Sequence, residues 1–258
     1  MKLTYDIHRV RPYINWIYFY HAWQLKPEAE QQRIREEAEL LLDVFENRYH
    51  TFAVCLVTDA HAEGDDIVLA DGARLPLLRQ QSGQPCLCLS DFVSPRADRV
   101  ALFATSVDAS MVTDAAGDPY QHMMAQLLAD RLAEATAELL HLEVRTRYWG
   151  YAPDEQLTVD ELHQERFQGI RPAVGYPSLP DTSLNFVLDR LIGMGQIGIV
   201  LTESGAMRPH ASVSGLMLSH PAARYFSVGK IGADQLADYA CRRGLPVETI
   251  RKFLAANL

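Results

Sequence analysis

The amino-acid sequence predicts an α+β fold in one domain. Helical and strand-like segments are intermixed along the chain without the regular strand–helix–strand alternation of a doubly wound sheet. Of the 258 residues, 48% are hydrophobic and 22% are charged, which is the balance of a globular protein with a substantial core. No internal repeat, low-complexity tract or linker divides the sequence. We therefore expect a single domain over residues 1–258.

The first half of the sequence predicts two long helices separated by short strands. Residues 27–49 carry an apolar stripe opposite a glutamate-rich face, which is typical of a surface helix. Residues 119–144 carry apolar side chains at helical spacing, so this helix is expected to be central and buried. Between them, Gly, Pro and Asp separate β-like runs that predict antiparallel strands at residues 52–57, 66–70, 86–89 and 100–106.

In the second half, a proline-rich segment interrupts the regular structure. Thr158 and Glu161 form a capping-box pattern at the start of a helix predicted over residues 158–167. Three prolines and Gly175 punctuate residues 169–181, which excludes a regular helix or a central strand and predicts an ordered loop. The remaining predictions are a helix at 182–194, a possible meander of strands at 196–202, 211–218 and 225–231, and helices at 233–243 and 247–255.

Charge, hydropathy and cysteine usage limit the classes of partner. The formal net charge is −9 and no basic block is present, which argues against nucleic acid. The longest apolar runs fall well short of the roughly 20 residues that a membrane-spanning helix requires. The first residues have no apolar run behind a basic one, so we expect no membrane partner and a cytoplasmic location. The four cysteines are expected to be reduced thiols.

The most informative segment is the loop sequence Arg-Pro-Ala-Val-Gly-Tyr-Pro that begins at Arg171. Two prolines fix φ and Gly175 lets the backbone approach another group, so that Arg171 and Tyr176 are presented from a stiff loop. Arginine offers a planar fork to a carboxylate, tyrosine offers a face and a hydroxyl to a ring, and free backbone groups can bind an adenine edge. Chemistry alone leaves two interpretations open, a site for a zwitterionic ligand and a structural connection.

Two other patterns are interpreted as structural. Asp59, His61 and Gly64 fit the D-x-H-x-x-G fingerprint of cobalamin-binding domains, but a strand rather than a helix is predicted next and the chain has no Gly-Gly dipeptide. We interpret this segment as a hairpin turn. Cys86 and Cys88 would share one face of a strand, but no second Cys or His pair stands at zinc-like spacing. No metal site is predicted.

Short motifs along nearly the whole chain occur in the order found in one known family. Residues 169–176 contain R-x-x-x-G-Y. The other matches are at residues 11–16, 64–67, 89–95, 129–134, 148–153, 201–204, 211–215 and 219–221, together with Trp23 and Tyr225. In this order they resemble the reactivation domain of cobalamin-dependent methionine synthase, which binds S-adenosylmethionine.

This resemblance implies a C-shaped α+β domain in which helices flank a bent antiparallel sheet and S-adenosylmethionine occupies a shallow groove. The roles that it implies are carboxylate binding by Arg171, contact with the cationic end by Glu134, adenine recognition by the backbone of Ala173 and Gly175, and packing near the methyl group by Tyr176 and Tyr225. Asp130, on the same helical face as Glu134, is expected to face the cobalamin-carrying partner and its displaced axial histidine.

The chain departs from the family pattern at a few positions. Asn15 stands where an acidic residue is expected, which removes a charge that could pair with the ligand's cationic end and predicts weaker binding. Residues 182–185, Arg208 and His210 also differ from the family pattern. These differences are expected to remodel the face that meets the corrinoid.

The function implied by the resemblance is to bind S-adenosylmethionine and support reductive methylation of cob(II)alamin, restoring methylcobalamin. Cobalamin would be carried by a separate methionine synthase core, because no convincing cobalamin domain is present here, and a flavodoxin- or ferredoxin-like protein would supply the electron. No catalytic acid or base is expected in this chain, and its standing as an enzyme on its own is left open. Two alternatives remain, a reactivator of another corrinoid methyltransferase and a non-catalytic S-adenosylmethionine-binding or interaction protein.

Overall fold

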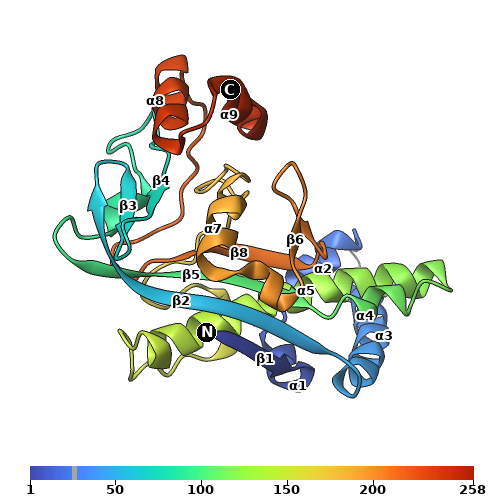
Figure 1. The fold of residues 1–258 in the computed structure, drawn as a ribbon. Helices are drawn as coiled ribbons and strands as arrows, with labels where there is room; N and C mark the ends of the chain where they lie inside the picture. The colour runs from blue at the N-terminus through green and yellow to red at the C-terminus, as the bar shows by residue number, and fades with distance from the viewer. Residues whose placement is uncertain (25–27) are drawn as a thin grey trace.

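A curved antiparallel sheet runs through the domain (Figure 1). The computed structural model describes residues 1–24 and 28–258. Within these ranges the sheet has six strands, of which five pair in the order β4-β3-β2-β5-β8. The sixth, β1, pairs with the start of β2 along the same side of that strand as β3, which pairs with its end. The long strands β2 and β5 bend as they cross the domain, which makes it C-shaped (Figure 1). The strands are β1 (Lys2–Asp6), β2 (His50–Glu63), β3 (Asp66–Leu69), β4 (Arg74–Pro76), β5 (Asp98–Val107) and β8 (Ser212–Met217).

Alternating side chains of β5 supply two hydrophobic cores, because successive residues of a strand point to opposite faces. Ala101 and Phe103 pack with α5, while Leu102 and Ala104 pack with α7 on the other face. The α5 face is covered by α1 (Ile7–Val10), α2 (Trp16–Ala22), α3 (Glu28–Glu46) and α5 (Pro119–Glu143). The other face is covered by α7 (Leu184–Ile192) and the 3-10 helix η4 (Met194–Ile197).

Helix α5 is the central helix, as its periodicity predicts. Asp118 caps it by accepting hydrogen bonds from the amides of Tyr120 and Gln121, and Pro119 occupies the first turn, where its missing amide costs nothing. A π-helical turn, η3 (Val144–Tyr148), continues the helix. The shorter elements nearby are η1 (Arg11–Tyr13), η2 (Leu89–Phe92), α4 (Ser110–Thr113) and α6 (Val159–His163).

The C-terminal helices form a third cluster beside β3 and β4, far from α3 (Figure 1). They are α8 (Ala233–Arg243) and α9 (Val247–Phe253), followed by η5 (Ala255–Asn257). Gly244 ends α8 in the left-handed conformation that glycine adopts without strain. Buried apolar side chains of both helices pack against Leu78 and Val228.

Most of the predicted elements are confirmed, with ends that differ by a few residues. This holds for the long helices, for the strands at 52–57, 66–70, 100–106 and 211–218, and for the ordered loop at 169–181. The start of the first long helix, predicted at residue 27, lies outside the described residues. The capping box of Thr158 and Glu161 is present, although α6 ends at His163. The turn predicted at Asp59 to Gly64 is shorter than expected, because residues 59–63 pair as the end of β2 and only Gly64 and Asp65 form the β2–β3 turn. No described helix has the length and hydropathy to cross a membrane.

Three strand predictions are wrong. The segment 86–89 is irregular because its amides bond to side chains, those of Leu87 to Gln80 and of Cys88 to Asp91. Cys86 and Cys88 therefore do not share a strand face, and all four cysteines are free thiols. The segment 196–202 begins in η4 and has Gly198 in the left-handed conformation, so only β6 (Val200–Leu201) forms and it pairs with β7 (Met207–Arg208).

The third wrong strand is 225–231, which has no regular structure. It runs beside the proline-rich loop, where the amide of Val228 donates to the carbonyl of Pro177. The expected three-stranded meander is therefore absent from the part of the chain that the structure describes. Of its three members, only residues 212–217 enter the main sheet.

Candidate functional site

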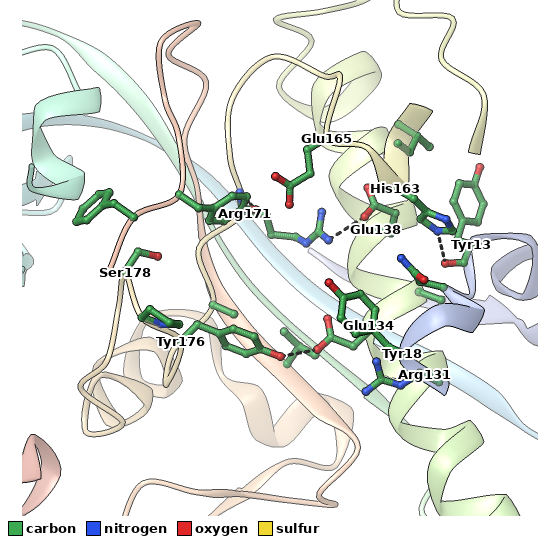
Figure 2. Close-up of a pocket in the computed structure, with 18 residues that line it drawn as sticks. Tyr13, Tyr18, Arg131, Glu134, Glu138, His163, Glu165, Arg171, Tyr176 and Ser178 are labelled. Carbon is green, nitrogen blue, oxygen red and sulfur yellow. Dashed lines mark hydrogen bonds and ion pairs between the residues drawn. The ribbon is translucent and has the colours of Figure 1, made fainter. Parts of the chain in front are cut away.

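A cleft of about 610 Å³ lies between α5, the N-terminal segment and the proline-rich loop (Figure 2). Its volume is within the range of about 300–1,000 Å³ that is usual for small-molecule sites. The residues that line it include Tyr13, Asn15 and Tyr18 from the N-terminal segment, Arg131, Glu134 and Glu138 from α5, Glu165, Arg171, Ala173 and Tyr176 from the following loops, and Tyr225.

The proline-rich loop is held as an irregular addition to the edge of β8. The carbonyl of Pro172 accepts from the amide of Leu216 (3.0 Å), and the amide of Val174 donates to the carbonyl of Ser214 (2.9 Å). These bonds bracket the pair Ala173 and Gly215, so the amide of Ala173 points away from β8. A Cβ on Gly215 would lie 2.2 Å from the carbonyl oxygen of Pro172, so glycine is required for this approach.

Arg171 enters the cleft with two of its guanidinium nitrogens held. Nη2 donates to Oε2 of Glu138 at 2.9 Å, and Nη1 donates to Nδ1 of His141 at 3.1 Å. The arginine side chain remains 15% exposed. Its backbone amide donates to the hydroxyl of Tyr225 at 3.0 Å, which ties that ring to the base of the loop. A guanidinium has five N–H donors, so three have no partner within residues 1–24 and 28–258 and remain for a ligand.

Tyr176 and Glu134 close one side of the cleft. The tyrosine hydroxyl donates to Oε1 of Glu134 at 2.9 Å across the gap between the loop and α5 (Figure 2). Burial of the hydroxyl and the nearby Glu134 carboxylate raise the pKa of Tyr176 to about 12. Beyond this contact lies a second hollow of about 290 Å³ that contains Asp130 and His210. Oδ1 of Asp130 lies 3.2 Å from Nδ1 of His210.

Six of the eight predicted site residues line the main cleft, namely Asn15, Glu134, Arg171, Ala173, Tyr176 and Tyr225. Gly175 lies in the turn behind it, with φ at +89°, and its amide donates to the carbonyl of Leu179. Asp130 lines the second hollow only. The side chain of Asn15 accepts from the amide of Ile17 and so caps α2.

Three polar residues that shape the site were not predicted from the sequence. Glu138 and His141 follow Glu134 at helical spacing, so a polar stripe on a helix expected to be buried could have revealed them. Oε1 of Glu138 is buried and has no hydrogen-bond partner in residues 1–24 and 28–258. Glu165 has a φ of +55°, which is unusual for a residue with a side chain, and burial raises the pKa of its carboxyl.

Fold and cleft together define an α+β domain with a preformed site for a small charged molecule. The family model described as "Vitamin B12 dependent methionine synthase, activation domain" matches residues 6–244. A solved structure described as the MetH reactivation domain bound to AdoHcy is similar over 100% of this chain and 90% of that one, with 36% sequence identity and a TM-score of 0.94. The chain belongs to the activation-domain family of vitamin B12-dependent methionine synthase.

Proposed function

We propose that this protein binds S-adenosylmethionine in the cleft beside Arg171 and supports reductive methylation of cob(II)alamin on a separate methionine synthase core, restoring methylcobalamin. The observation that carries the proposal is an arginine held at two nitrogens in an open cleft, with three donors left over. The similar reactivation domain bound to AdoHcy supports the choice of ligand.

The charges of the cleft fit such a ligand. Three carboxylates, Glu134, Glu138 and Glu165, and two guanidinium groups, Arg131 and Arg171, are among the lining residues. S-adenosylmethionine carries an ammonium, a sulfonium and a carboxylate, so its excess of positive charge matches the excess of carboxylates. An unpaired buried acceptor such as Oε1 of Glu138 costs about 1–3 kcal/mol, and a small adjustment around a bound cation would remove that cost.

In this proposal the residues of the chain position the ligand. Arg171 holds the carboxylate, Glu134 meets the cationic end, and the outward backbone of Ala173 with the carbonyl of Gly175 binds adenine. Tyr176 and Tyr225 flank the methyl group; both rings are partly exposed at the cleft, which supports this role. Asn15 contributes less than an acidic residue would, because it carries no charge to pair with the cationic end of the ligand.

No residue of this chain is asked to act as an acid or a base. Cobalamin bound to the partner supplies the methyl acceptor after one-electron reduction by a flavodoxin- or ferredoxin-like protein. The contribution of this domain is orientation of the reacting carbon, which by itself accounts for large rate effects in group transfer.

We assign Asp130 to the face that meets the partner, as a contact for the displaced axial histidine. It lies on α5 one turn from Glu134 and lines the neighbouring hollow rather than the ligand cleft. Its present hydrogen-bond partner, His210, has a side chain that is 84% exposed and can move away at little cost.

The direct test mixes the protein with a methionine synthase core in the cob(II)alamin form, S-adenosylmethionine and a reductant, and follows the cobalamin spectrum. We expect conversion to methylcobalamin with the wild type and a much slower conversion with Arg171→Ala. Arg33→Ala, at an exposed arginine of α3, is the matched control and is expected to behave as wild type. Absence of conversion with the wild type would contradict the proposal.

A further inference from the structure

His141 is completely buried on α5, directly behind Arg171. Its Nδ1 lies 3.1 Å from Nη1 of Arg171, and its Nε2 lies 3.4 Å from the hydroxyl of Tyr151. A guanidinium can only donate, so Nδ1 must accept and carries no proton. The ring proton is then on Nε2 and points to the oxygen of Tyr151, whose own hydroxyl donates to the carbonyl of Gln168 (3.3 Å). The contacts therefore select one tautomer of the neutral ring.

The surroundings of His141 hold the ring in place and keep it neutral. Phe167 packs edge-on against it, with ring centroids 4.9 Å apart at 81°. The guanidinium of Arg145 lies 4.1 Å from the centroid of Phe167 and forms two hydrogen bonds with Glu155, at 2.8 and 2.7 Å. Burial, Arg145 and Arg171 lower the pKa of His141 well below its usual value.

Two contacts fix the guanidinium of Arg171 where one would not. Nη2 donates to Glu138 (Figure 2). That hydrogen bond alone would leave the planar group free to rotate about the contact. The second bond, from Nη1 to His141, determines the direction in which the remaining three N–H groups point. Recognition of a carboxylate depends on that direction, because the two oxygens must meet two parallel N–H groups.

We propose that His141 is a positioning residue: its neutral Nδ1 orients the Arg171 guanidinium toward the carboxylate of the ligand. This inference rests on the proposed function, in which that ligand is S-adenosylmethionine or its demethylated product. His141 is not among the residues that line the cleft, so in this proposal it acts on the ligand only through Arg171. It affects only the amino-acid end of the ligand and leaves the nucleoside end unchanged.

The test compares two ligands and two substitutions by calorimetry. S-adenosylhomocysteine has the amino-acid end, and 5′-methylthioadenosine lacks it, so the ratio of their dissociation constants measures what the contacts to that end contribute, those of Arg171 and Glu134. A change in this ratio that His141 variants cause reports on Arg171, because His141 contacts Arg171. His141→Asn keeps an acceptor at the place of Nδ1, and His141→Gln keeps a donor at the place of Nε2 but loses that acceptor. Thermal unfolding checks that both variants are folded.

We expect His141→Gln to lower the affinity for S-adenosylhomocysteine by about tenfold or more, in line with the loss of a charge-assisted hydrogen bond. The affinity for 5′-methylthioadenosine should not change. His141→Asn should stay within about threefold of wild type for both ligands. Tyr151→Phe serves as a second variant outside the cleft. It removes the acceptor for Nε2–H and allows the other tautomer. The affinity for S-adenosylhomocysteine should therefore fall, while the affinity for 5′-methylthioadenosine stays the same.

Other outcomes overturn the inference in distinguishable ways. If His141→Gln binds both ligands as wild type does, then His141 has only a packing role. The same holds if the folded variant loses affinity for both ligands to the same extent. The same conclusion follows if the folded Asn and Gln variants lose the preference for S-adenosylhomocysteine over 5′-methylthioadenosine to the same extent. If the wild type binds neither ligand, the proposed function fails and the inference falls with it.

Discussion

The proline-rich loop is anchored by charged clusters at both of its ends, and the two clusters differ in whether their unpaired groups adjoin a cleft. At its start, Arg171 meets Glu138 and His141 in an open cleft, and Oε1 of Glu138 has no partner in the described parts of the chain. At its end, Asp181 is 1% exposed. Its carboxylate accepts from the amide and hydroxyl of Ser183 (2.8 and 2.9 Å) and from the hydroxyl of Tyr239 (2.7 Å).

The difference separates a structural anchor from a binding group. The Asp181 carboxylate has a donor at each oxygen and lies 3.3 Å from Nη1 of Arg243. That nitrogen makes no hydrogen bond within residues 1–24 and 28–258, but the Asp181 and Arg243 side chains are only 1% and 5% exposed, so a ligand cannot reach it. In the Arg171 cluster, three N–H groups of the guanidinium and Oε1 of Glu138 have no hydrogen-bond partner among the described residues. Buried polar groups are normally paired, so a cluster with unused capacity beside a cleft indicates a partner that arrives from outside.

The largest effect is expected for Asp181→Ala. Removing this carboxylate leaves Arg243 buried without its counter-ion and Tyr239 without its acceptor, and breaking a buried pair in this way costs about 3–5 kcal/mol. The free energy of unfolding, measured with urea, should fall by that amount. Asp234→Ala, near the start of α8, is the control. A loss below about 1 kcal/mol would mean that the Asp181 cluster is no anchor.

Arg171→Ala should show the opposite balance between binding and stability. We expect the affinity for S-adenosylhomocysteine to fall about 100-fold, which corresponds to about 2.7 kcal/mol. The free energy of unfolding should fall by only about 1 kcal/mol, because both side chains line the cleft and removal of the Arg171 side chain opens Glu138 to water. Calorimetry and urea unfolding on the same preparation give both values. If stability falls more than binding, the two clusters do not differ in kind.

His141 predicts how stability changes with pH. Its pKa is lowered in the folded protein, so below the unfolded value of about 6.5 the unfolded chain binds the additional proton and the free energy of unfolding falls. The decrease from this residue approaches about 1.4 kcal/mol per pH unit until the folded pKa is reached. Urea unfolding of the wild type and of His141→Asn at pH 7 and 5.5 isolates this contribution. Parallel pH profiles would show that His141 titrates normally.

The smallest effect is expected for Asn15→Asp. Aspartate is as good an N-cap as asparagine, so α2 should keep its stability. The added charge at the cleft should raise the affinity for S-adenosylmethionine by about threefold, the gain expected for a partly exposed ion pair. 5′-Methylthioadenosine, which has no charge, should bind as before. Equal strengthening of both ligands would show that the charge acts through the structure of the cleft.

Local chemistry made much of this molecule predictable. The apolar period of α5 and the prolines between residues 169 and 181 act within a few residues, so the helix and the stiff loop could be inferred directly. The strand predicted at 225–231 failed because its apolar residues pack against the C-terminal helices, and the amide of Val228 bonds to the carbonyl of Pro177 rather than to a strand. Glu138 and His141 were missed because the residue that they hold, Arg171, is 33 and 30 positions away.

The sequence by itself determined the α+β class, the elements with a clear period, the stiffness of the loop and the family resemblance. Tertiary structure alone decided which polar groups meet, which of them are saturated and which tautomer His141 adopts. The physical reason is that side-chain period and backbone preference are local properties, whereas hydrogen-bond satisfaction and pKa depend on neighbours that only folding brings together.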